Sequence, residues 1–317
     1  MNNFDILKPG ILKKGDKIGV VSPASRPSDD TQYFKGVQYL EKLGYIVISG
    51  KNVLNQRGYL AGEDITRIND LNLMFADPDI KAVFCSRGGY GVPRILDQIN
   101  YEAIKKNPKI FVGYSDVTAL NLAIWAKTGL VTFSGPMVAV EMGKGIHEYS
   151  ESSLWQNLSN ATGTKKFENP ADEKLKIITP GKAEGRLIAG CLSVFVGLLG
   201  TPYIPDLAGA ILVLEDIDEE PYRLDRYFAQ LKLSGIFDNI SGLIFGQFIN
   251  CTPTDQSKPS LTIEEVIRDY VKNLNIPIIA NFAYGHGEIK LTLPIGVQAR
   301  LDTAEDGLTI LEKVIEL

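Results

Sequence analysis

The sequence contains few cysteines and no excess of basic charge. Its 317 residues include three cysteines that lie far apart and form no Cys-x-x-Cys pair. A disulfide framework is therefore not expected, and a reducing compartment is favoured. Lys and Arg number 33 against 38 Asp and Glu, which gives a net charge of −5. We therefore expect neither a nucleic-acid-binding surface nor a polybasic segment that binds membranes.

The sequence also lacks the pattern of a signal peptide, because no basic region followed by an apolar segment is visible at its start. One uncharged run of 19 residues, 187–205, is long enough to be tested as a membrane span. It contains three glycines and two prolines. We therefore interpret it as a buried helix of about ten residues followed by a loop, and we expect no membrane segment.

The first half of the chain alternates strand patterns with helix patterns. Hydrophobic residues make up 44% of the chain and charged residues 22%, which is typical of a globular protein. Short apolar runs that alternate with amphipathic segments predict a parallel sheet covered by helices on both faces. The expected strands are 17–22, 45–49, 81–86, 109–114 and 130–133. The expected helices are 31–43, 64–75, 92–98 and 117–127.

The second half is richer in strand patterns. Strands are expected at 210–215, 242–248, 276–282, 289–293, 297–301 and 308–311, and helices at 190–199, 222–233 and 263–274. Because turns separate the later strands, we expect a smaller, barrel-like α+β domain that is rich in β-strands. The predicted division is an N-terminal α/β domain over 1–143, a polar connecting segment over 144–180 and a C-terminal domain over 181–317.

The chain has two histidines, and their surroundings differ. His147 lies in the polar connecting segment and is interpreted as a solvated loop residue. His286 follows an apolar strand and lies between Gly285 and Gly287, which allow a sharp turn and leave the imidazole accessible. Histidine suits general acid–base catalysis near neutral pH. His286 is therefore the candidate base, and an ordinary turn histidine is the alternative.

Ser115 lies between an expected strand and an expected helix, in the motif GYSD. A hydroxyl at such a turn projects from the carboxyl end of the strand, close to the free N–H groups of the helix N-terminus. Those groups can stabilise an oxyanion, so Ser115 is a candidate nucleophile. However, Ser115 or Asp116 could simply cap the helix, and Val117 replaces the second glycine of the G-x-S-x-G motif.

A glycine-rich segment, Arg87-Gly88-Gly89-Tyr90-Gly91, follows another expected strand. Its glycines allow the backbone to approach a ligand closely. The segment could hold a phosphate, although it lacks the G-x-G-x-x-G spacing and the lysine of a P-loop. It could instead bind an oxyanion or a carboxylate through its amides and its arginine. A plain turn with the arginine in an ion pair is the remaining interpretation.

Glu215 ends a strongly apolar strand, and four more carboxylates lie within the next five residues. No histidine or cysteine is nearby and the spacing is not that of an EF-hand, so a metal site is not expected. The acidic run could pair with Arg223 and Arg226, or Glu215 could orient an imidazole as the acid of a triad. A triad of Ser115, Glu215 and His286 would draw on both halves of the chain, which would place the site between the two domains.

Four segments of the sequence resemble those of the LD-carboxypeptidases, which are serine peptidases that act on murein tetrapeptides. They are SRGGYG (86–91), GYSD with TFSGPM (113–116 and 132–137), LEDIDEEPYRLDR (214–226) and GHGEIKLTLPIG (285–296). The similarity extends from residue 15 to residue 302, and residues 144–180 are its least informative part. The resemblance implies an N-terminal flavodoxin-like or Rossmann-like domain, a smaller C-terminal β-rich domain, no metal or cofactor, a cytoplasmic location and often a homodimer.

The resemblance also implies roles for individual residues. It assigns the nucleophile to Ser115, the acid to Glu215, the base to His286 and the oxyanion-binding amides to Gly88, Gly89 and Asp116. The implied reaction removes the terminal D-alanine of a murein tetrapeptide during peptidoglycan recycling. The bond that breaks joins D-alanine to the L-centre of meso-diaminopimelate or L-lysine.

Arg87 is our own hypothesis for the group that binds the terminal carboxylate of this substrate, and Tyr90 beside it is a second candidate for substrate binding. Two alternatives remain. The chain also resembles the microcin C immunity peptidases, which cleave a peptidyl or aminoacyl nucleotide with the same triad. It could otherwise be a non-catalytic protein that binds peptides or nucleotides.

Overall fold

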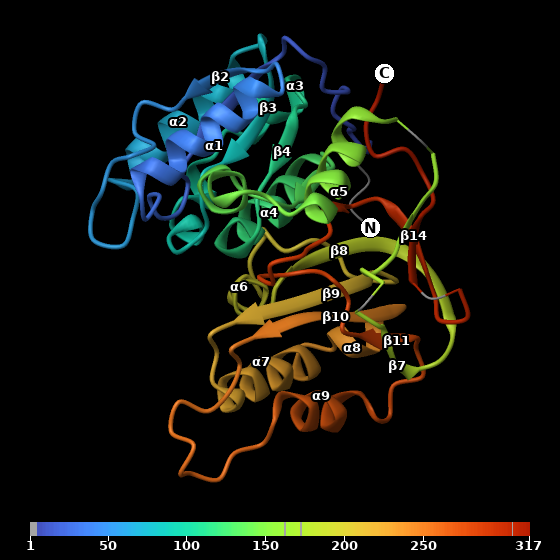
Figure 1. The fold of residues 1–317 in the computed structure, drawn as a ribbon. Coiled ribbons are helices and arrows are strands. Elements are labelled where there is room, and N and C mark those ends of the chain that lie inside the picture. The colour runs from blue at the N-terminus through green and yellow to red at the C-terminus, as the bar shows by residue number, and fades with distance from the viewer. Residues whose placement is uncertain (1–4, 162, 172, 306) are drawn as a thin grey trace.

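The chain forms two sheets, one in each lobe of the molecule (Figure 1). The computed structural model describes residues 5–161, 163–171, 173–305 and 307–317. The first sheet has the strand order β12-β5-β4-β3-β1-β2. Its strands are β1 (Lys17–Val21), β2 (Ile46–Ser49), β3 (Ile80–Cys85), β4 (Ile110–Val112), β5 (Thr132–Ser134) and β12 (Leu293–Ile295). All neighbouring pairs are parallel except β12 with β5.

Helices connect the strands of this sheet, as the alternating pattern predicts. They are α1 (Asp30–Lys42), α2 (Asp64–Ala76), α3 (Tyr101–Lys106), α4 (Thr118–Thr128) and α5 (Glu148–Ser159). Asp29 caps α1 by accepting a hydrogen bond from the Thr31 amide (2.8 Å). Helix α4 is buried along almost its whole length, because it packs against β5 and β12 on one side and against β8 and α6 of the other lobe. It thus lies between the two sheets.

The second sheet has the strand order β6-β14-β13-β8-β9-β10-β11-β7. Its strands are β6 (Lys165–Phe167), β7 (Lys176–Thr179), β8 (Lys182–Cys191), β9 (Ile211–Ile217), β10 (Gly242–Ile249), β11 (Ile278–Ala280), β13 (Gln298–Asp302) and β14 (Gly307–Ile310). Strands β8 to β11 are parallel, and antiparallel strands flank them on both sides. The helices of this lobe are α6 (Leu192–Gly197), α7 (Pro221–Leu233), α8 (Ile236–Asn239) and α9 (Ile263–Val271).

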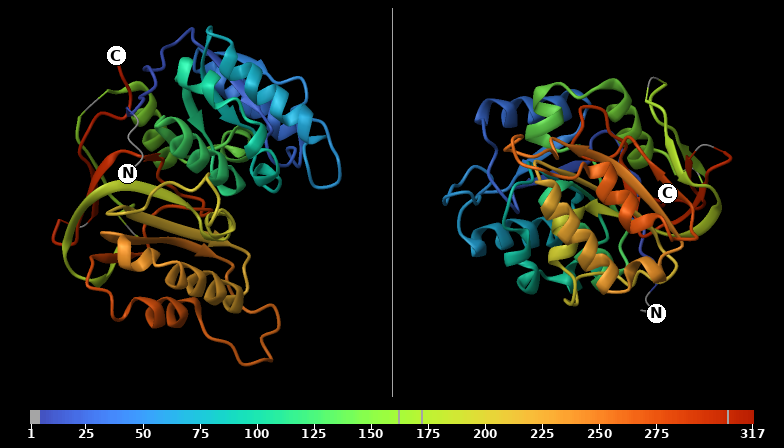
Figure 2. Two further views of the ribbon diagram at one scale, coloured as in Figure 1. Left: turned by 180° about the vertical axis from the view of Figure 1, so that it is seen from behind. Right: turned by 90° about the horizontal axis from the view of Figure 1, so that it is seen from below.

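Helices α7 and α9 lie together on the face of the second sheet that points away from the first lobe (Figures 1 and 2). Helix α9 begins with a capping box, in which Thr262 Oγ1 accepts from the Glu265 amide (3.2 Å) and Glu265 Oε2 accepts from the Thr262 amide (2.8 Å). No helix in the described ranges is both long enough and apolar enough to span a bilayer.

The structure confirms the predicted fold class, a mainly parallel α/β sheet followed by a second, strand-rich domain. Three local predictions were wrong. In the uncharged run 187–205, residues 187–191 are the end of β8, and the helix that follows, α6, has six residues instead of about ten. A fully buried strand is as continuously apolar as a buried helix, so periodicity could not separate them. Residues 92–98 form two short 3-10 turns around Pro93, and the strand expected at 289–293 begins only at Leu293.

The connecting segment contains more structure than its polar sequence suggested. It holds the twelve-residue helix α5 and the strands β6 and β7. The chain then returns to the first lobe near its end, because β12 pairs with β5. The predicted boundaries at residues 143 and 180 remain predictions.

Candidate active site

Ser115 lies at the turn between β4 and α4, where the sequence placed it. Its φ is +65°, which is unusual for a residue other than glycine. Such a backbone costs on the order of 1–3 kcal/mol and persists only where the surrounding structure imposes it, as it often does at functional sites. Ser115 starts a short 3-10 turn that leads into α4, and its side chain is half-buried. The turn therefore has the strained character of a nucleophile elbow without the G-x-S-x-G motif.

The glycine-rich segment lies directly against this turn. A Cβ atom added to Gly88 would be 2.7 Å from Ser115 Cβ and 3.0 Å from Ser115 Oγ. Ser25 holds the segment in place, since its amide donates to Gly88 O (3.2 Å) and its Oγ accepts from the Tyr90 amide (3.1 Å). Gly89 has a φ of +110° and passes close to the Ser25 side chain. The absence of a side chain at Gly88 allows the backbone to approach Ser115, and its absence at Gly89 allows the approach to Ser25.

Asp116 ties the two segments together. Its Oδ2 accepts a hydrogen bond from the Val92 amide (2.8 Å), and the side chain is buried. Burial raises the pKa of Asp116 to about 6, although the bond from Val92 opposes this shift. Beside it, the buried Arg67 donates to Gly91 O (2.9 Å) and to Pro23 O. The glycine-rich segment is therefore fixed from both ends.

His286 and Glu215, which lies in β9, are in direct contact. Glu215 Oε2 lies 2.7 Å from His286 Nδ1, although 71 residues separate them in sequence. The side chain of Glu215 is 1% exposed and that of His286 is 11% exposed. Gly285 has a φ of +127°, and a Cβ atom there would be 2.6 Å from Glu215 Oε2. A glycine before the histidine is thus required for this contact. A carboxylate at Nδ1 favours the tautomer that leaves Nε2 free to accept a proton.

The imidazole also lies beside the turn that carries Ser115. The ring of His286 packs edge-to-face on the ring of Tyr114, with 5.0 Å between centroids and an interplanar angle of 62°. Tyr114 immediately precedes Ser115. The structure thus places His286 in contact with Glu215 and with Tyr114, the residue before Ser115. Ser115 and the glycine-rich segment belong to the first lobe, and Glu215 belongs to the second sheet.

His147, by contrast, lies at the N-terminus of α5. It is exposed and caps α5, with its Nδ1 accepting from the Tyr149 amide (3.2 Å). The acidic run after Glu215 forms local contacts, among them Glu219 with Arg223 at 3.7 Å. His147 is thus an exposed residue, as interpreted, and the acidic run pairs with one of the two arginines expected, Arg223.

Arg87 and Tyr90 line a pocket of about 640 Å³ beside the glycine-rich segment. Arg87 is half-buried, and its guanidinium donates one long hydrogen bond to Arg26 O (3.4 Å). No carboxylate of the described residues forms an ion pair with it, whereas Arg26 pairs with Asp30. The ring of Tyr90 is 69% exposed and packs edge-to-face on Tyr59, with 6.0 Å between centroids. The predicted ion pair of a plain turn is thus not formed.

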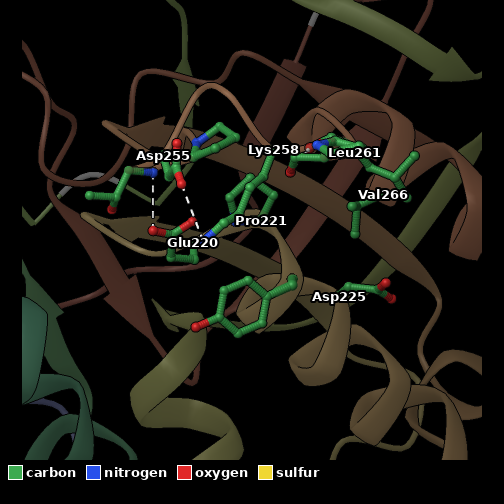
Figure 3. Close-up of a pocket in the computed structure, with 12 residues that line it drawn as sticks. Glu220, Pro221, Asp225, Asp255, Lys258, Leu261 and Val266 are labelled. Carbon is green, nitrogen blue, oxygen red and sulfur yellow. Dashed lines mark hydrogen bonds and ion pairs between the residues drawn. The ribbon is translucent and has the colours of Figure 1, made fainter.

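A second pocket, of about 490 Å³, is lined by the start of α7 and by residues 253–261 (Figure 3). Its charged groups are largely satisfied, because Glu220 accepts from the Thr254 amide (3.0 Å) and Lys258 pairs with Asp255 (3.2 Å). It contains no triad residue and no unpaired group comparable with Arg87, so we do not assign chemistry to it. In the parts of the chain that the structure describes, no three His, Cys, Asp or Glu residues are grouped as metal ligands would be.

Two charged residues in contact with Tyr114 were not predicted from the sequence. Glu141 lies in a π-helical turn, Val138–Met142, and Lys290 lies on the loop that carries His286. The two side chains form an ion pair beside Tyr114. A single charged residue within an apolar run, as in MVAVEM, is the signal that could have indicated Glu141.

Comparisons with known proteins match nearly the whole chain. Family models of the LD-carboxypeptidase N-terminal domain and C-terminal domain match residues 18–135 and 184–301. The probable murein peptide carboxypeptidase of Bacillus subtilis (strain 168) is 43% identical, over 94% of this chain and 92% of that protein. Among solved structures, microcin C7 self-immunity protein MccF in complex with aspartyl sulfamoyl adenosine has a TM-score of 0.90 and 29% identity, over 98% and 100% of the two chains. The muramoyltetrapeptide carboxypeptidase of Oxalobacter formigenes has a TM-score of 0.80 and 27% identity, over 93% and 97%.

Proposed function

The chain belongs to the LD-carboxypeptidase family, and from this premise we propose that it is a serine carboxypeptidase that removes the terminal D-alanine from murein tetrapeptides. Relatives named as murein peptide and muramoyltetrapeptide carboxypeptidases support this substrate class. The observation that carries the proposal is the hydrogen bond between Glu215 and His286, formed beside the strained turn of Ser115.

In the proposed mechanism, His286 Nε2 takes the proton of Ser115 Oγ as the oxygen attacks the carbonyl carbon of the L-centre. Glu215 holds the imidazole in the required tautomer and stabilises the imidazolium. His286 then gives the proton to the leaving amine of D-alanine, and the C–N bond breaks. A water molecule, deprotonated by the same imidazole, hydrolyses the resulting acyl-enzyme.

The negative charge that develops on the carbonyl oxygen requires hydrogen-bond donors. We assign this role to the amides of Gly88 and Gly89, on the segment that contacts Ser115 at Gly88, and to the amide of Asp116, which follows Ser115 in the chain. Each such donor contributes about 3–4 kcal/mol to transition-state stabilisation in known cases. Because these amides belong to backbone that Ser25 and Asp116 hold in place, little reorganisation is needed when the charge appears.

Arg87 is the proposed ligand of the substrate's terminal carboxylate, and Tyr90 forms the edge of the same pocket. A half-buried guanidinium without an acidic partner is suited to bind a carboxylate. Wild type should therefore prefer a tetrapeptide with a free carboxylate over its C-terminal amide, and Arg87→Ala should reduce this preference by about tenfold or more. Arg57→Ala is the control, since Arg57 is exposed and paired with Glu63. An unchanged preference in Arg87→Ala would reject the assignment.

The primary test is mass spectrometry of murein tetrapeptide incubated with purified wild type, Ser115→Ala and the surface control Ser152→Ala, without added metal. Loss of one alanine with wild type and the control, but not with Ser115→Ala, is the expected result. Loss with all three proteins would show that Ser115 only starts the helix. No loss with any of them would reject the substrate.

A microcin-immunity activity is the alternative, and one specific observation favours it: MccF bound to an aminoacyl sulfamoyl nucleoside aligns with 98% of this chain. An aminoacyl nucleotide offered in the same assay separates the two functions, because release of the amino acid without loss of alanine from the tetrapeptide would favour this alternative. Tight ligand binding without turnover of either compound would indicate the third possibility, a binding protein. A role in peptidoglycan recycling, a cytoplasmic location and a homodimer stay predictions from the family resemblance.

A further inference from the structure

Three buried side chains form a polar cluster that contacts the imidazole of His286 through the ring of Tyr114. We call Tyr114, Glu141 and Lys290 the Tyr114 cluster. Tyr114 is 6% exposed and Lys290 is 4% exposed, and the side chain of Glu141 is 9% exposed. Charged groups are seldom buried to this extent unless they are paired and hydrogen-bonded. The cluster lies outside the triad, and the proposed chemistry does not use it.

The cluster is fully connected. The Tyr114 hydroxyl donates to Glu141 Oε1 (2.7 Å) and accepts from Lys290 Nζ (2.9 Å), and Lys290 also pairs directly with Glu141. The other carboxylate oxygen, Oε2, accepts from the Met137 amide (2.9 Å). The ammonium lies 4.3 Å from the centroid of the Tyr114 ring.

The electrostatics of the cluster favour one protonation pattern. Burial opposes ionisation of Glu141, but the ammonium of Lys290 and the hydrogen bonds hold the pKa of Glu141 below its usual value. Burial, together with the charge of Glu141, raises the pKa of Tyr114 well above its usual range. Tyr114 is thus a neutral donor to an ionised carboxylate, and its ring orientation is fixed by both partners.

The cluster joins elements that carry the reaction. Tyr114 directly precedes Ser115, and its ring packs against His286. Lys290 lies four residues after His286, and its amide donates to Ser150 Oγ of α5 (2.9 Å). Glu141 belongs to the π-helical turn that follows the first sheet, and such turns are frequent at functional sites. The ion pair between Glu141 and Lys290 therefore connects the loop that carries His286 to the lobe that carries Ser115.

We propose that the Tyr114 cluster positions the imidazole of His286 relative to Ser115, and that Glu141 and Lys290 are positioning residues of this enzyme. The inference rests on the proposed role of His286 as the base. Removing one partner of a buried ion pair leaves the other charge uncompensated, so the single variant Lys290→Met should be unstable. Replacing both partners with apolar residues of similar volume is often neutral for stability. The double variant Glu141→Leu/Lys290→Met therefore separates positioning from folding.

The experiment compares wild type with the double variant, with Tyr114→Phe, which keeps the ring but removes the hydroxyl, and with Lys109→Met. Lys109 is the matched control, because it is a buried lysine that donates to Asp77 O and Ile80 O (2.6 and 2.8 Å) at the opposite end of the first sheet. The first readout is kcat and KM on murein tetrapeptide. The second is the pair of ¹⁵N shifts of the His286 imidazole, recorded with His147→Asn in every protein so that one histidine remains.

We expect kcat to fall about tenfold or more in the double variant and less in Tyr114→Phe, with KM changed by less than about threefold. Because a displaced ring would lose part of its hydrogen bond to Glu215, we also expect the imidazole shifts to move from those of a single Nδ1–H tautomer towards averaged values. Lys109→Met should change neither readout. A kcat and imidazole shifts in the double variant equal to those of wild type would overturn the proposal. If wild type does not act on the tetrapeptide, the shifts still decide about positioning, since they require no substrate.

Discussion

Replacing Gly88 with alanine should displace Ser115, the proposed nucleophile, without removing any hydrogen-bond donor. The added Cβ atom would lie 2.7 Å from Ser115 Cβ and 3.3 Å from Tyr114 O. Carbon atoms in contact are normally about 3.5–4.0 Å apart, so the two segments must separate by about 1 Å. A misplacement of about 1 Å can cost about 100-fold in rate, which corresponds to about 2.7 kcal/mol of activation free energy. We expect a loss of this size in kcat/KM for the Gly88→Ala variant.

The assay is steady-state release of D-alanine from murein tetrapeptide, with thermal unfolding measured on the same samples. Gly197→Ala is the matched control, because Gly197 is exposed in α6 and no atom lies within 4 Å of the position its Cβ would take. The control should keep the wild-type rate. It does not matter whether Ser115 or the glycine-rich segment moves, since either movement changes the distance between the oxyanion donors and the hydroxyl. A Gly88→Ala rate within about threefold of the control would refute the assigned geometry.

Three further predictions concern the acid, its glycine neighbour and the buried aspartate. Glu215→Gln removes the charge opposite the imidazolium of His286. A comparable change in the Ser-His-Asp template lowers kcat by about 10⁴-fold, and we expect a loss of similar size here. A steady-state rate above about one tenth of wild type would show that Glu215 does not act as the acid of a triad. Gly285→Ala places a Cβ atom 2.6 Å from Glu215 Oε2, so both activity and the thermal midpoint should fall, and an unchanged midpoint would contradict the close contact. Burial raises the pKa of Asp116 to about 6, above its value in the unfolded chain, so its charge opposes folding above pH 6 and this penalty vanishes towards pH 4. Asp116→Asn should therefore be more stable than wild type by up to about 3 kcal/mol at pH 8 and nearly equally stable at pH 4, and urea unfolding that shows the larger gain at pH 4 would reverse this reasoning.

The first sheet was predictable because its elements are defined locally. Strands β1 and β3 are short apolar runs, and α1 carries its apolar residues at helical spacing. The predictions failed where contacts between distant segments determine the secondary structure. Strand β12 has three residues including a proline, and it forms because β5, about 160 residues earlier, offers it an edge. No pattern within such a segment indicates its partner.

The candidate site shows the same division. Ser115 and His286 could be selected from local sequence, because a hydroxyl at a strand-to-helix turn and an imidazole between glycines are chemical signals in themselves. The contact of Glu215 with His286 depends on the pairing of strands and on the path of a loop. Local sequence therefore offered this contact only as one of two alternatives for Glu215. Glu141 and Lys290 were not selected at all, since each is unremarkable until burial brings them together across 149 residues.

The loop that carries His286, the proposed base, is fixed by both halves of the chain. Its amides donate to Ser150 Oγ and Ser153 Oγ of α5 through Lys290 and Thr292 (2.9 and 3.0 Å), and β12 continues it into the first sheet. On the other side, His286 binds Glu215 of the second sheet. A rotation of one lobe against the other would have to break either the hydrogen bonds of this loop to α5 or the hydrogen bond between His286 and Glu215. The imidazole is therefore held in place by folding of the entire chain, and neither half alone contains the groups that would orient it.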